Sequence, residues 1–176
     1  MRLFIAAELP ENIKEGLCVL QKKLPEATLR LVKKQHMHLT LKFLGEASPA
    51  KAEHIRKALS KVKFSPLDIN VFSLGVFRSG RFIRVVWAGL QPENNIICLQ
   101  KQIDEALQKM FPKDKKFSAH LTLARAKFVK NNDKFIEELE KIRIAPLGFE
   151  IRSFALKKST LTPQGPVYET LAVFPA

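Results

Sequence analysis

The sequence is poor in residues that build covalent or metal-based frameworks. It contains two cysteines and four histidines among 176 residues, and it has no CxxC pair. Both thiols, Cys18 and Cys98, fall in stretches with helical apolar spacing, where a cysteine is expected to act as a small core residue. This pattern argues against structural zinc and against a disulfide scaffold, so no metal and no cofactor are expected.

Long apolar runs are also missing. No stretch approaches the ~18 consecutive apolar residues of a membrane-spanning helix. The amino-terminal run from Met1 to Ile5 leads directly into a strand-like pattern and is too short for the core of a signal peptide. We therefore expect a cytoplasmic protein without a membrane partner.

Acidic residues are in the minority. The 30 Lys and Arg residues outnumber the 17 Asp and Glu residues, which gives a formal net charge of +13. Such a surplus predicts a polyanionic partner, for which phosphate groups are the obvious chemistry, although solubility alone is an alternative explanation. Basic residues gather in four segments that are expected to be loops and could follow an RNA backbone: Lys33-Lys34, Arg78–Arg84, Lys113–Lys116 and Lys157-Lys158.

What the sequence contains twice is the tetrapeptide His-Leu-Thr-Leu. It occupies residues 38–41 and returns at residues 120–123, which is 82 residues later. Its alternation of polar and apolar residues has the period of a half-buried strand. His38 and Thr40 are therefore expected on one face of their strand, and His120 and Thr122 on one face of theirs. If the two strands meet, two imidazoles and two hydroxyls converge on one cleft.

The duplication extends beyond this motif. Pro-Glu-Asn opens predicted helices at residues 10 and 92, and Pro-Leu precedes predicted strands at residues 66 and 146. These features recur in the same order, so the chain contains two copies of a strand–helix–strand–helix–strand unit. We predict a single domain over residues 1–176 with an α+β, bilobal, pseudo-two-fold duplicated fold. Two mainly antiparallel sheets would face a central groove, with the helices outside.

Apolar periodicity and turn residues give the expected elements. Helices are predicted over about 10–24, from Ser48-Pro49, over 92–110 and over 132–142. Strands are predicted over 2–9, 28–32, 67–77 and 82–90, and at both tetrapeptides. The chain is expected to finish with two strands, about 147–157 and 166–174, which Pro163 and Gly165 connect. Trp87 is expected in the core, His36 at the groove rim or in solvent, and Tyr168 against the sheet within reach of the groove edge.

The paired histidines suit proton transfer. An imidazole has an unperturbed pKa of ~6.5, so two facing rings can act as acid and base near neutral pH. The threonine hydroxyls can donate hydrogen bonds to phosphate oxygens. This chemistry demands no metal, and no carboxylate is placed in the sequence to orient either imidazole as in a nucleophile triad.

These motifs resemble the 2H phosphoesterase superfamily, and in particular its branch of RNA 2′,3′-cyclic phosphodiesterases, also known as LigT-like 2′-5′ RNA ligases. The resemblance covers nearly the whole chain. It runs from Arg2–Ala6 through His38–Glu46 and His120–Arg125 to Ser159–Glu169. The family often has Trp where Leu31 stands and Pro where Ala119 stands, and both are packing or turn positions.

The resemblance implies metal-independent hydrolysis of RNA 2′,3′-cyclic phosphate ends to 2′-phosphates. It also implies that such proteins join or reopen 2′-5′ linkages in tRNA halves. His38 would be the acid that protonates the leaving 3′-oxygen, and His120 the base that activates water, although pseudo-symmetry allows the reverse on sequence grounds. Thr40 and Thr122 would contact the phosphate. The expected partner is RNA with 2′,3′-cyclic phosphate ends, and the protein is expected to be a monomer.

The fifth residue after each histidine differs between the copies, being Phe43 in one and Arg125 in the other. A regular strand would point both away from the cleft, whereas a bulge could bring them to its rim. The family resemblance implies that Phe43 and Arg125 do reach the rim of the cleft. There both side chains could stack on a base, and Arg125 could also bind the phosphate. A core phenylalanine and a solvated arginine are the plain alternatives.

Two other functions fit the same groove. One is a non-catalytic RNA-binding module, which the pattern disfavours because a pure binder has no need of two imidazoles. The other is a phosphodiesterase for a different substrate, such as ADP-ribose 1″,2″-cyclic phosphate or a 2′-5′ oligonucleotide.

Overall fold

A computed structural model describes residues 1–176, with nine strands, four α-helices and one short 3₁₀ helix, η1 (Lys34–His36). The helices are α1 (Glu11–Lys22), α2 (Pro49–Leu59), α3 (Glu93–Leu107) and α4 (Asn132–Glu140). The strands are β1 (Arg2–Glu8), β2 (Thr28–Leu31), β3 (His38–Glu46), β4 (Leu67–Ser79), β5 (Phe82–Gln91), β6 (His120–Phe128), β7 (Gly148–Ile151), β8 (Ser153–Thr162) and β9 (Gly165–Pro175). None of the helices is long and apolar enough to cross a membrane.

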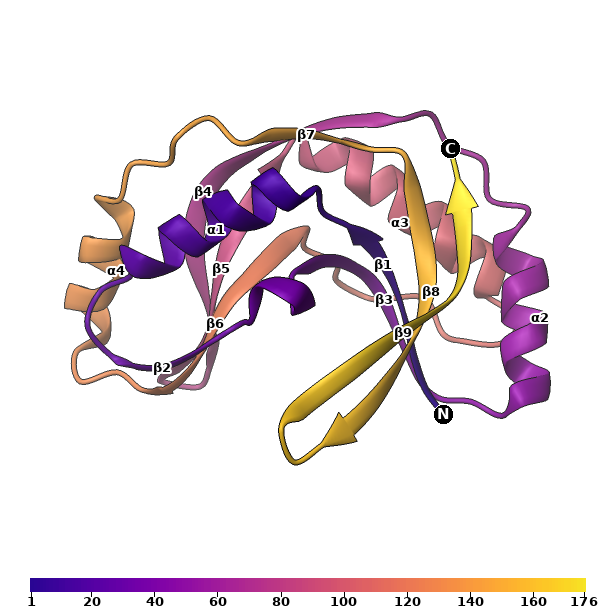
Figure 1. Cartoon of the computed structure of the whole chain (residues 1–176), viewed down its shortest axis with the longest axis horizontal. Coiled ribbons are helices and arrows are strands. Elements are labelled where there is room, and N and C mark those ends of the chain that lie inside the picture. Colours follow the sequence, from indigo (N-terminus) through magenta and orange to yellow (C-terminus); the bar gives the residue numbers. More distant parts are fainter.

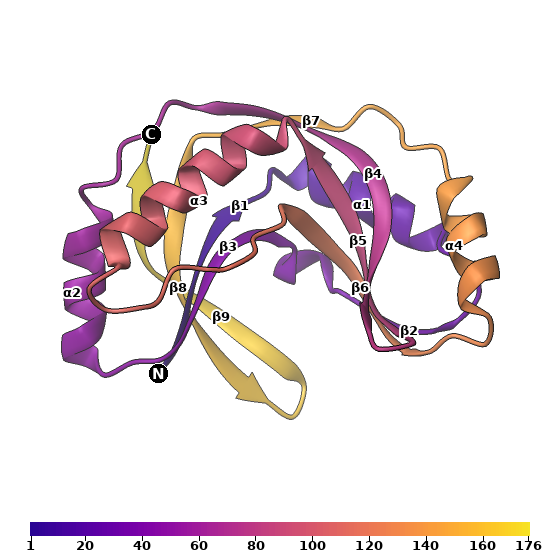
Figure 2. The same ribbon diagram turned by 180° about the vertical axis from the view of Figure 1, so that it is seen from behind.

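The strands form two antiparallel sheets. The first sheet has the strand order β3-β1-β8-β9, and the second has the order β2-β6-β5-β4-β7. In Figure 1 the second sheet stands on the left and the first on the right, with α1 and α4 beside the second sheet and α2 and α3 beside the first. The view from behind in Figure 2 shows the same arrangement. The predicted α+β fold with two antiparallel sheets is confirmed.

The two copies exchange their first helices. Helix α1 follows β1 of the first sheet but contacts β6 of the second, whereas α3 follows β5 of the second sheet but contacts β3 and α2 on the side of the first. The side-chain amide of buried Gln21 on α1 donates to the backbone carbonyls of Val32 and Leu123, at 2.8 Å each. The main core of 31 buried residues consequently draws on both sheets.

The predicted strand over residues 147–157 is wrong in one respect. These residues form two strands, β7 and β8, which separate at Arg152 and belong to different sheets. Strand β7 pairs with β4, and β8 pairs with β1 and β9. Phe149 and Ile151 are buried, and the next buried residue is Phe154, so the alternation changes phase where the chain crosses between sheets. Gly165, with a φ of 119°, begins β9 after the turn, as predicted.

Two residues expected in the core lie elsewhere. Cys18 and Cys98 are on helices as predicted and are free thiols, but Cys98 is exposed. Trp87 is only half-buried because strand alternation turns it away from its buried neighbours Val86 and Ala88. Its ring packs against Phe77, with ring centroids 5.3 Å apart.

Candidate active site

The two tetrapeptides lie where the sheets approach each other. Strand β3 is an edge strand of the first sheet, and β6 of the second sheet contacts it. The leucines of both tetrapeptides are buried. Their polar residues line one cleft of about 620 Å³: His38, Thr40, His120 and Thr122. The structure therefore brings together the four side chains that the repeated motif singled out.

Matching β-bulges decide which residues enter this cleft. The register of β3 against β1 slips by one residue at Leu41, and the register of β6 against β5 slips at Leu123. A bulge leaves two successive residues on one face of the sheet and so reverses the alternation beyond it. Lys42 is buried in consequence, whereas Phe43 and Arg125 line the cleft. Phe43 is 72% exposed, so the alternative of a core phenylalanine is wrong.

The backbone orients the ring of His120. Its Nδ1 lies 2.8 Å from the carbonyl oxygen of Ser118. Because a carbonyl can only accept, Nδ1 carries the hydrogen, and Nε2 is left to exchange a proton with a substrate. Phe77 packs edge-on against the imidazole, with centroids 4.8 Å apart. Glu93, at the start of α3, accepts a hydrogen bond from the backbone N–H of Ala119, which fixes the chain directly before the histidine.

Aromatic side chains surround the ring of His38. Its centroid lies 5.1 Å from that of Phe4 and 5.4 Å from that of Tyr168, which meets it edge-on. Tyr168 also packs on His36, and both line the cleft, as predicted for the groove edge. Glu8 pairs with His38 across strands β1 and β3 and forms an ion pair with Lys157. Sequence reasoning missed Phe4 and Glu8 because neither belongs to a repeated motif.

Burial lowers the pKa of both imidazoles. It lowers the pKa of His38 to about 4, and Glu8 and a hydrogen bond with the His36 backbone oppose it. Burial also lowers the pKa of His120. The hydrogen bond to the Ser118 carbonyl opposes this effect, and the charge of Arg125 adds to it. Both rings are thus neutral at pH 7 in the free protein, and a bound phosphate anion would favour protonation. Beside His38 the Glu8 carboxylate raises the pKa of the ring and the Lys157 ammonium lowers it, whereas beside His120 the Arg125 guanidinium lowers it.

The cleft is lined by cations and by no Asp or Glu. Its basic residues are Arg2, Arg30, Lys33 and Arg125. Sequence reasoning missed Arg2 and Arg30, which stand alone rather than in basic runs. Of the predicted basic segments only Lys33 reaches the cleft; Lys34, Lys157 and Lys158 form ion pairs with glutamates. No group of three or more His, Cys, Asp or Glu side chains is arranged to hold a metal ion.

A buried lysine connects the copies behind the cleft. Nζ of Lys42 lies 3.0 Å from the carbonyl oxygen of Pro112, 3.0 Å from Asp114 and 2.5 Å from Asp104. Gln100 and the backbone N–H of Asp114 donate further hydrogen bonds to Asp104. Strand β3 thereby holds the segment that leads to the second histidine strand. Regular alternation would place Lys42 in the cleft with Thr40, which is why the sequence alone does not reveal this network.

Comparison with protein-family models identifies the family of this chain. The model described as "LigT like Phosphoesterase" matches the chain twice, over residues 7–87 and 89–168. The chain belongs to the LigT-like phosphoesterase family. Each match contains one His-Leu-Thr-Leu motif, so the family match also divides the chain into the two copies that the repeat spacing predicts.

Curated LigT-like relatives match over nearly their full length. A protein of Methanocaldococcus jannaschii named RNA 2′,3′-cyclic phosphodiesterase is 38% identical over 173 residues, which cover 97% of this chain and 98% of the relative. A protein of the same name from Archaeoglobus fulgidus is 37% identical over 177 residues, covering 99% of each. The resemblance stated from the motifs is confirmed.

Two solved structures share the fold. Escherichia coli LigT complexed with 3′-AMP has a TM-score of 0.79 and 27% identity, covering 99% of this chain and 97% of that one. The structure of TT0787 of Thermus thermophilus has a TM-score of 0.81 and 28% identity, with the same coverage.

Proposed function

We propose that this LigT-like phosphoesterase is an RNA 2′,3′-cyclic phosphodiesterase that needs no metal ion. The observation that carries the proposal is one cleft that holds the two tetrapeptide histidines, both threonines and four Arg or Lys side chains, with no carboxylate in its lining. Negative charge on a bound phosphate would meet hydrogen-bond donors and cations there and no carboxylate that repels it. The names of the relatives from M. jannaschii and A. fulgidus support the choice of substrate.

In the proposed reaction His120 takes a proton from water, and the water oxygen bonds to phosphorus. The bond from phosphorus to the 3′-oxygen breaks, and His38 donates its proton to that oxygen. The products are a 2′-phosphate and a 3′-hydroxyl, and the two rings have exchanged protonation states. Thr40 and Thr122 donate to non-bridging oxygens, while Arg125 offsets the charge that develops on them.

The neighbouring charges support these roles. Burial lowers the pKa of His38 and Lys157 lowers it further, but Glu8 opposes both, and a carboxylate beside the ring favours the protonated form that an acid needs. Burial also lowers the pKa of His120, and Arg125 adds to that effect, which favours the neutral form that a base needs. The symmetric motif alone leaves the two roles interchangeable. If the 5′-hydroxyl of a second RNA takes the place of water, the same proton transfers form a 2′-5′ linkage, as in the joining of tRNA halves. Phe43 and Arg125 would stack on the base of the terminal nucleotide.

We also propose that residues 1–176 act as one domain and as a monomer. Both catalytic histidines come from one chain, and the main core contains residues of both sheets. A second copy is therefore not needed to complete the cleft.

Product analysis tests the proposal. The protein is incubated with an RNA that ends in a 2′,3′-cyclic phosphate, with and without EDTA, and with paired tRNA halves. We expect a 2′-phosphate product that forms at the same rate in EDTA. A 3′-phosphate product, or complete loss of turnover in EDTA, would contradict the proposal. Intact RNA binding without any product would instead identify a binding module.

A further inference from the structure

The β4–β5 hairpin carries an exposed aromatic ring among free cations, outside the cleft. Phe82 is 50% exposed, and the guanidinium carbons of Arg81 and Arg84 each lie 5.1 Å from the centroid of its ring. Arg78 precedes the turn at Gly80, whose φ is 57°. None of the salt bridges in the structure includes these three arginines. Their charges are therefore available to an anionic partner.

Phe82 and the two arginines that lie over its ring face the same side of the sheet as the cleft. Ile83 and Val86 of β5 point into the smaller core with α4, whereas Val85 lines the cleft. Because successive strand residues alternate, Phe82 lies on the cleft side of β5. Arg84 is skipped in the pairing of β4 with β5, and this bulge leaves it on the same face as Val85.

The neighbouring strand extends the basic surface. On β6, Ala124 and Ala126 lie in the smaller core and Arg125 lines the cleft. Lys127 is skipped in the pairing of β6 with β2, and this bulge leaves exposed Lys127 on the face opposite buried Ala126, which is the cleft side. Lys127 is two residues beyond Arg125, or about 7 Å along the strand. The surface formed by Arg81, Phe82, Arg84 and Lys127, which we name the hairpin platform, thus continues directly from the cleft.

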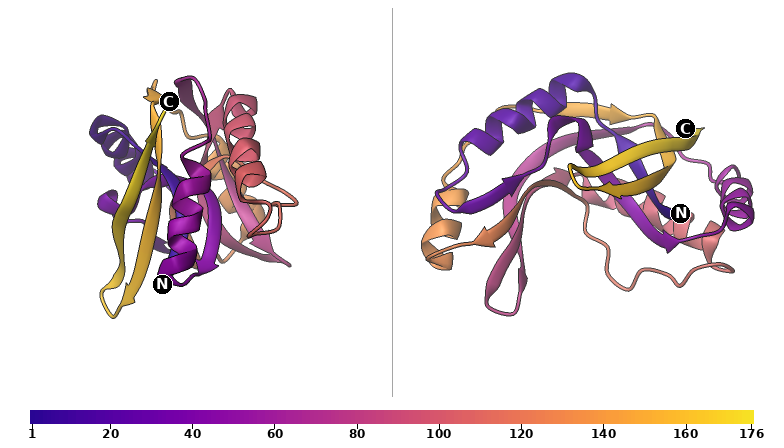
Figure 3. Two further views of the ribbon diagram at one scale, coloured as in Figure 1. Left: turned by 90° about the vertical axis from the view of Figure 1, so that its right-hand side faces the viewer. Right: turned by 60° about the horizontal axis from the view of Figure 1, so that its bottom comes forward.

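The β8–β9 hairpin differs from β4–β5 in its exposed residues and in its charge. The β4–β5 and β8–β9 hairpins project toward the same side of the molecule in Figures 1 and 2, and the tilted view in Figure 3 shows both. On β8–β9 the exposed residues include Leu161 and Val167, and Lys158 forms an ion pair with Glu169. Of the two projecting hairpins, only β4–β5 offers both an aromatic face and unpaired positive charge.

We propose that the hairpin platform binds the single-stranded RNA that precedes the cyclic phosphate end. This inference rests on the proposed function, because a 2′,3′-cyclic phosphate is the last nucleotide of a strand whose remainder must leave the cleft. Phe82 stacks on an upstream base, and the cations contact the backbone phosphates. Stacking accepts any base, so the platform favours longer RNA over a mononucleotide with little preference for sequence.

The test compares two substrates and matched variants. For each protein kcat/KM is measured with a mononucleoside 2′,3′-cyclic phosphate and with an eight-nucleotide RNA that has the same end. Phe82→Ala should lower the value for the RNA by about 5- to 100-fold and leave the mononucleotide value unchanged. Phe82→Trp should retain the wild-type preference because an indole also stacks. Arg81→Ala with Arg84→Ala should lower the value for the RNA and weaken its salt dependence.

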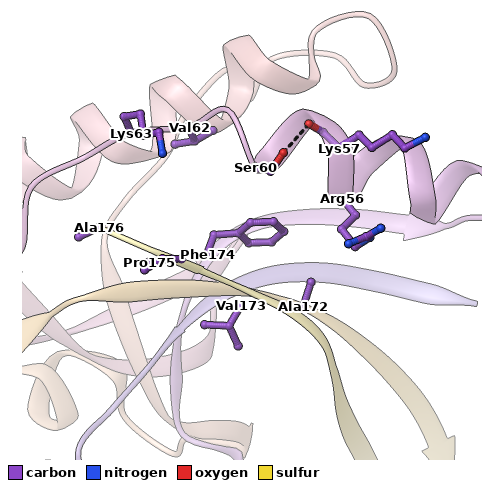
Figure 4. A pocket seen from close by; sticks show the side chains of 10 residues that line it. All are labelled: Arg56, Lys57, Ser60, Val62, Lys63, Ala172, Val173, Phe174, Pro175 and Ala176. Carbon is purple, nitrogen blue, oxygen red and sulfur yellow. Dashed lines mark hydrogen bonds between the residues drawn. The ribbon is translucent and has the colours of Figure 1, made fainter.

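A charge-matched control comes from the far side of the molecule. Arg56 and Lys57 of α2 line a separate cavity of about 330 Å³ beside the carboxy-terminal end of β9, shown in Figure 4. Figure 1 shows α2 at the opposite end of the molecule from the β4–β5 hairpin. Arg56→Ala with Lys57→Ala removes the same charge there and should leave both kcat/KM values unchanged.

Binding of a fluorescent eight-nucleotide RNA separates the two proposals. Suppose that the wild type turns over the RNA, and that the Phe82 and arginine variants match it in RNA binding and in kcat/KM for the RNA. This result would overturn the platform and leave the proposed function standing. An equal loss on both substrates would also overturn it, because Phe82 would then act through the cleft. If no substrate turns over, the proposed function fails, yet binding lost in Phe82→Ala and kept in the α2 control would uphold the platform.

Discussion

Replacement of Lys42 by methionine is expected to cost about 3–5 kcal/mol of the free energy of unfolding. Lys42 is 3% exposed, and its ammonium group contacts Asp104, Asp114 and the carbonyl oxygen of Pro112. Methionine fills a similar volume but carries no charge. Asp104, which is 5% exposed, would then remain as a buried carboxylate without a cation.

The size of this loss in the free energy of unfolding follows from the buried groups that lose their partner when Lys42 is replaced. Breaking a buried ion pair by removing one partner typically costs about 3–5 kcal/mol, and the Pro112 carbonyl loses a donor as well. Burial raises the pKa of Asp104, but hydrogen bonds from Lys42, the Asp114 backbone and Gln100 outweigh it, so its pKa is lowered overall. The stabilisation from Asp104 is therefore present above its unfolded pKa and lost as pH falls through the folded value.

Urea unfolding followed by the fluorescence of Trp87, the only tryptophan, measures the effect. The difference between wild type and Lys42→Met should be largest at neutral pH and shrink below about pH 4, where carboxylates become protonated. Adding Asp104→Asn should restore much of the lost stability because no buried charge remains. A loss below about 1 kcal/mol at pH 7, or a double variant no more stable than Lys42→Met alone, would refute this reasoning.

The remaining predictions concern the cleft. His38→Ala and His120→Ala should each lower kcat at least ~100-fold while RNA binding, measured by fluorescence anisotropy, survives; near-normal turnover in either variant would rule out the acid–base pair. The pH profile of kcat/KM should be bell-shaped with its optimum below about pH 6.5, because burial lowers the pKa of both His38, to about 4, and His120. Glu8→Gln removes the carboxylate that raises the pKa of His38, so one limb of the profile should move to lower pH. An unchanged profile would show that Glu8 does not act on the reaction.

Repetition made the paired motif and the duplicated fold predictable from the sequence. His38, Thr40, His120 and Thr122 could be assigned to one cleft because a strand has a fixed period. The bulges at Leu41 and Leu123 could not be located, since a bulge adds no residue type of its own and shows itself only in the pairing. The orientation of Phe43 and Arg125 was therefore left open by the pattern.

Other features depend on contacts between distant residues. The pairing of Glu8 with His38 needs the register of two strands, and the partners of Lys42 come from α3 and the loop after it. The separation of β7 from β8 is set by the neighbours that each strand finds. The catalytic roles of the cleft residues stay predictions that the kinetic experiments can decide.

The exchange of α1 and α3 between the two sheets gives the chain the geometry of a domain-swapped homodimer whose subunits have been joined end to end. In an isologous assembly a residue close to the two-fold axis meets its own counterpart. The histidine strands lie at such a position, so a single motif, once doubled, supplies both partners of the pair. Because α1 of the first half contacts β6 of the second and α3 of the second contacts β3 of the first, we expect circular dichroism to show fragments 1–80 and 81–176 unfolded alone and folded on mixing.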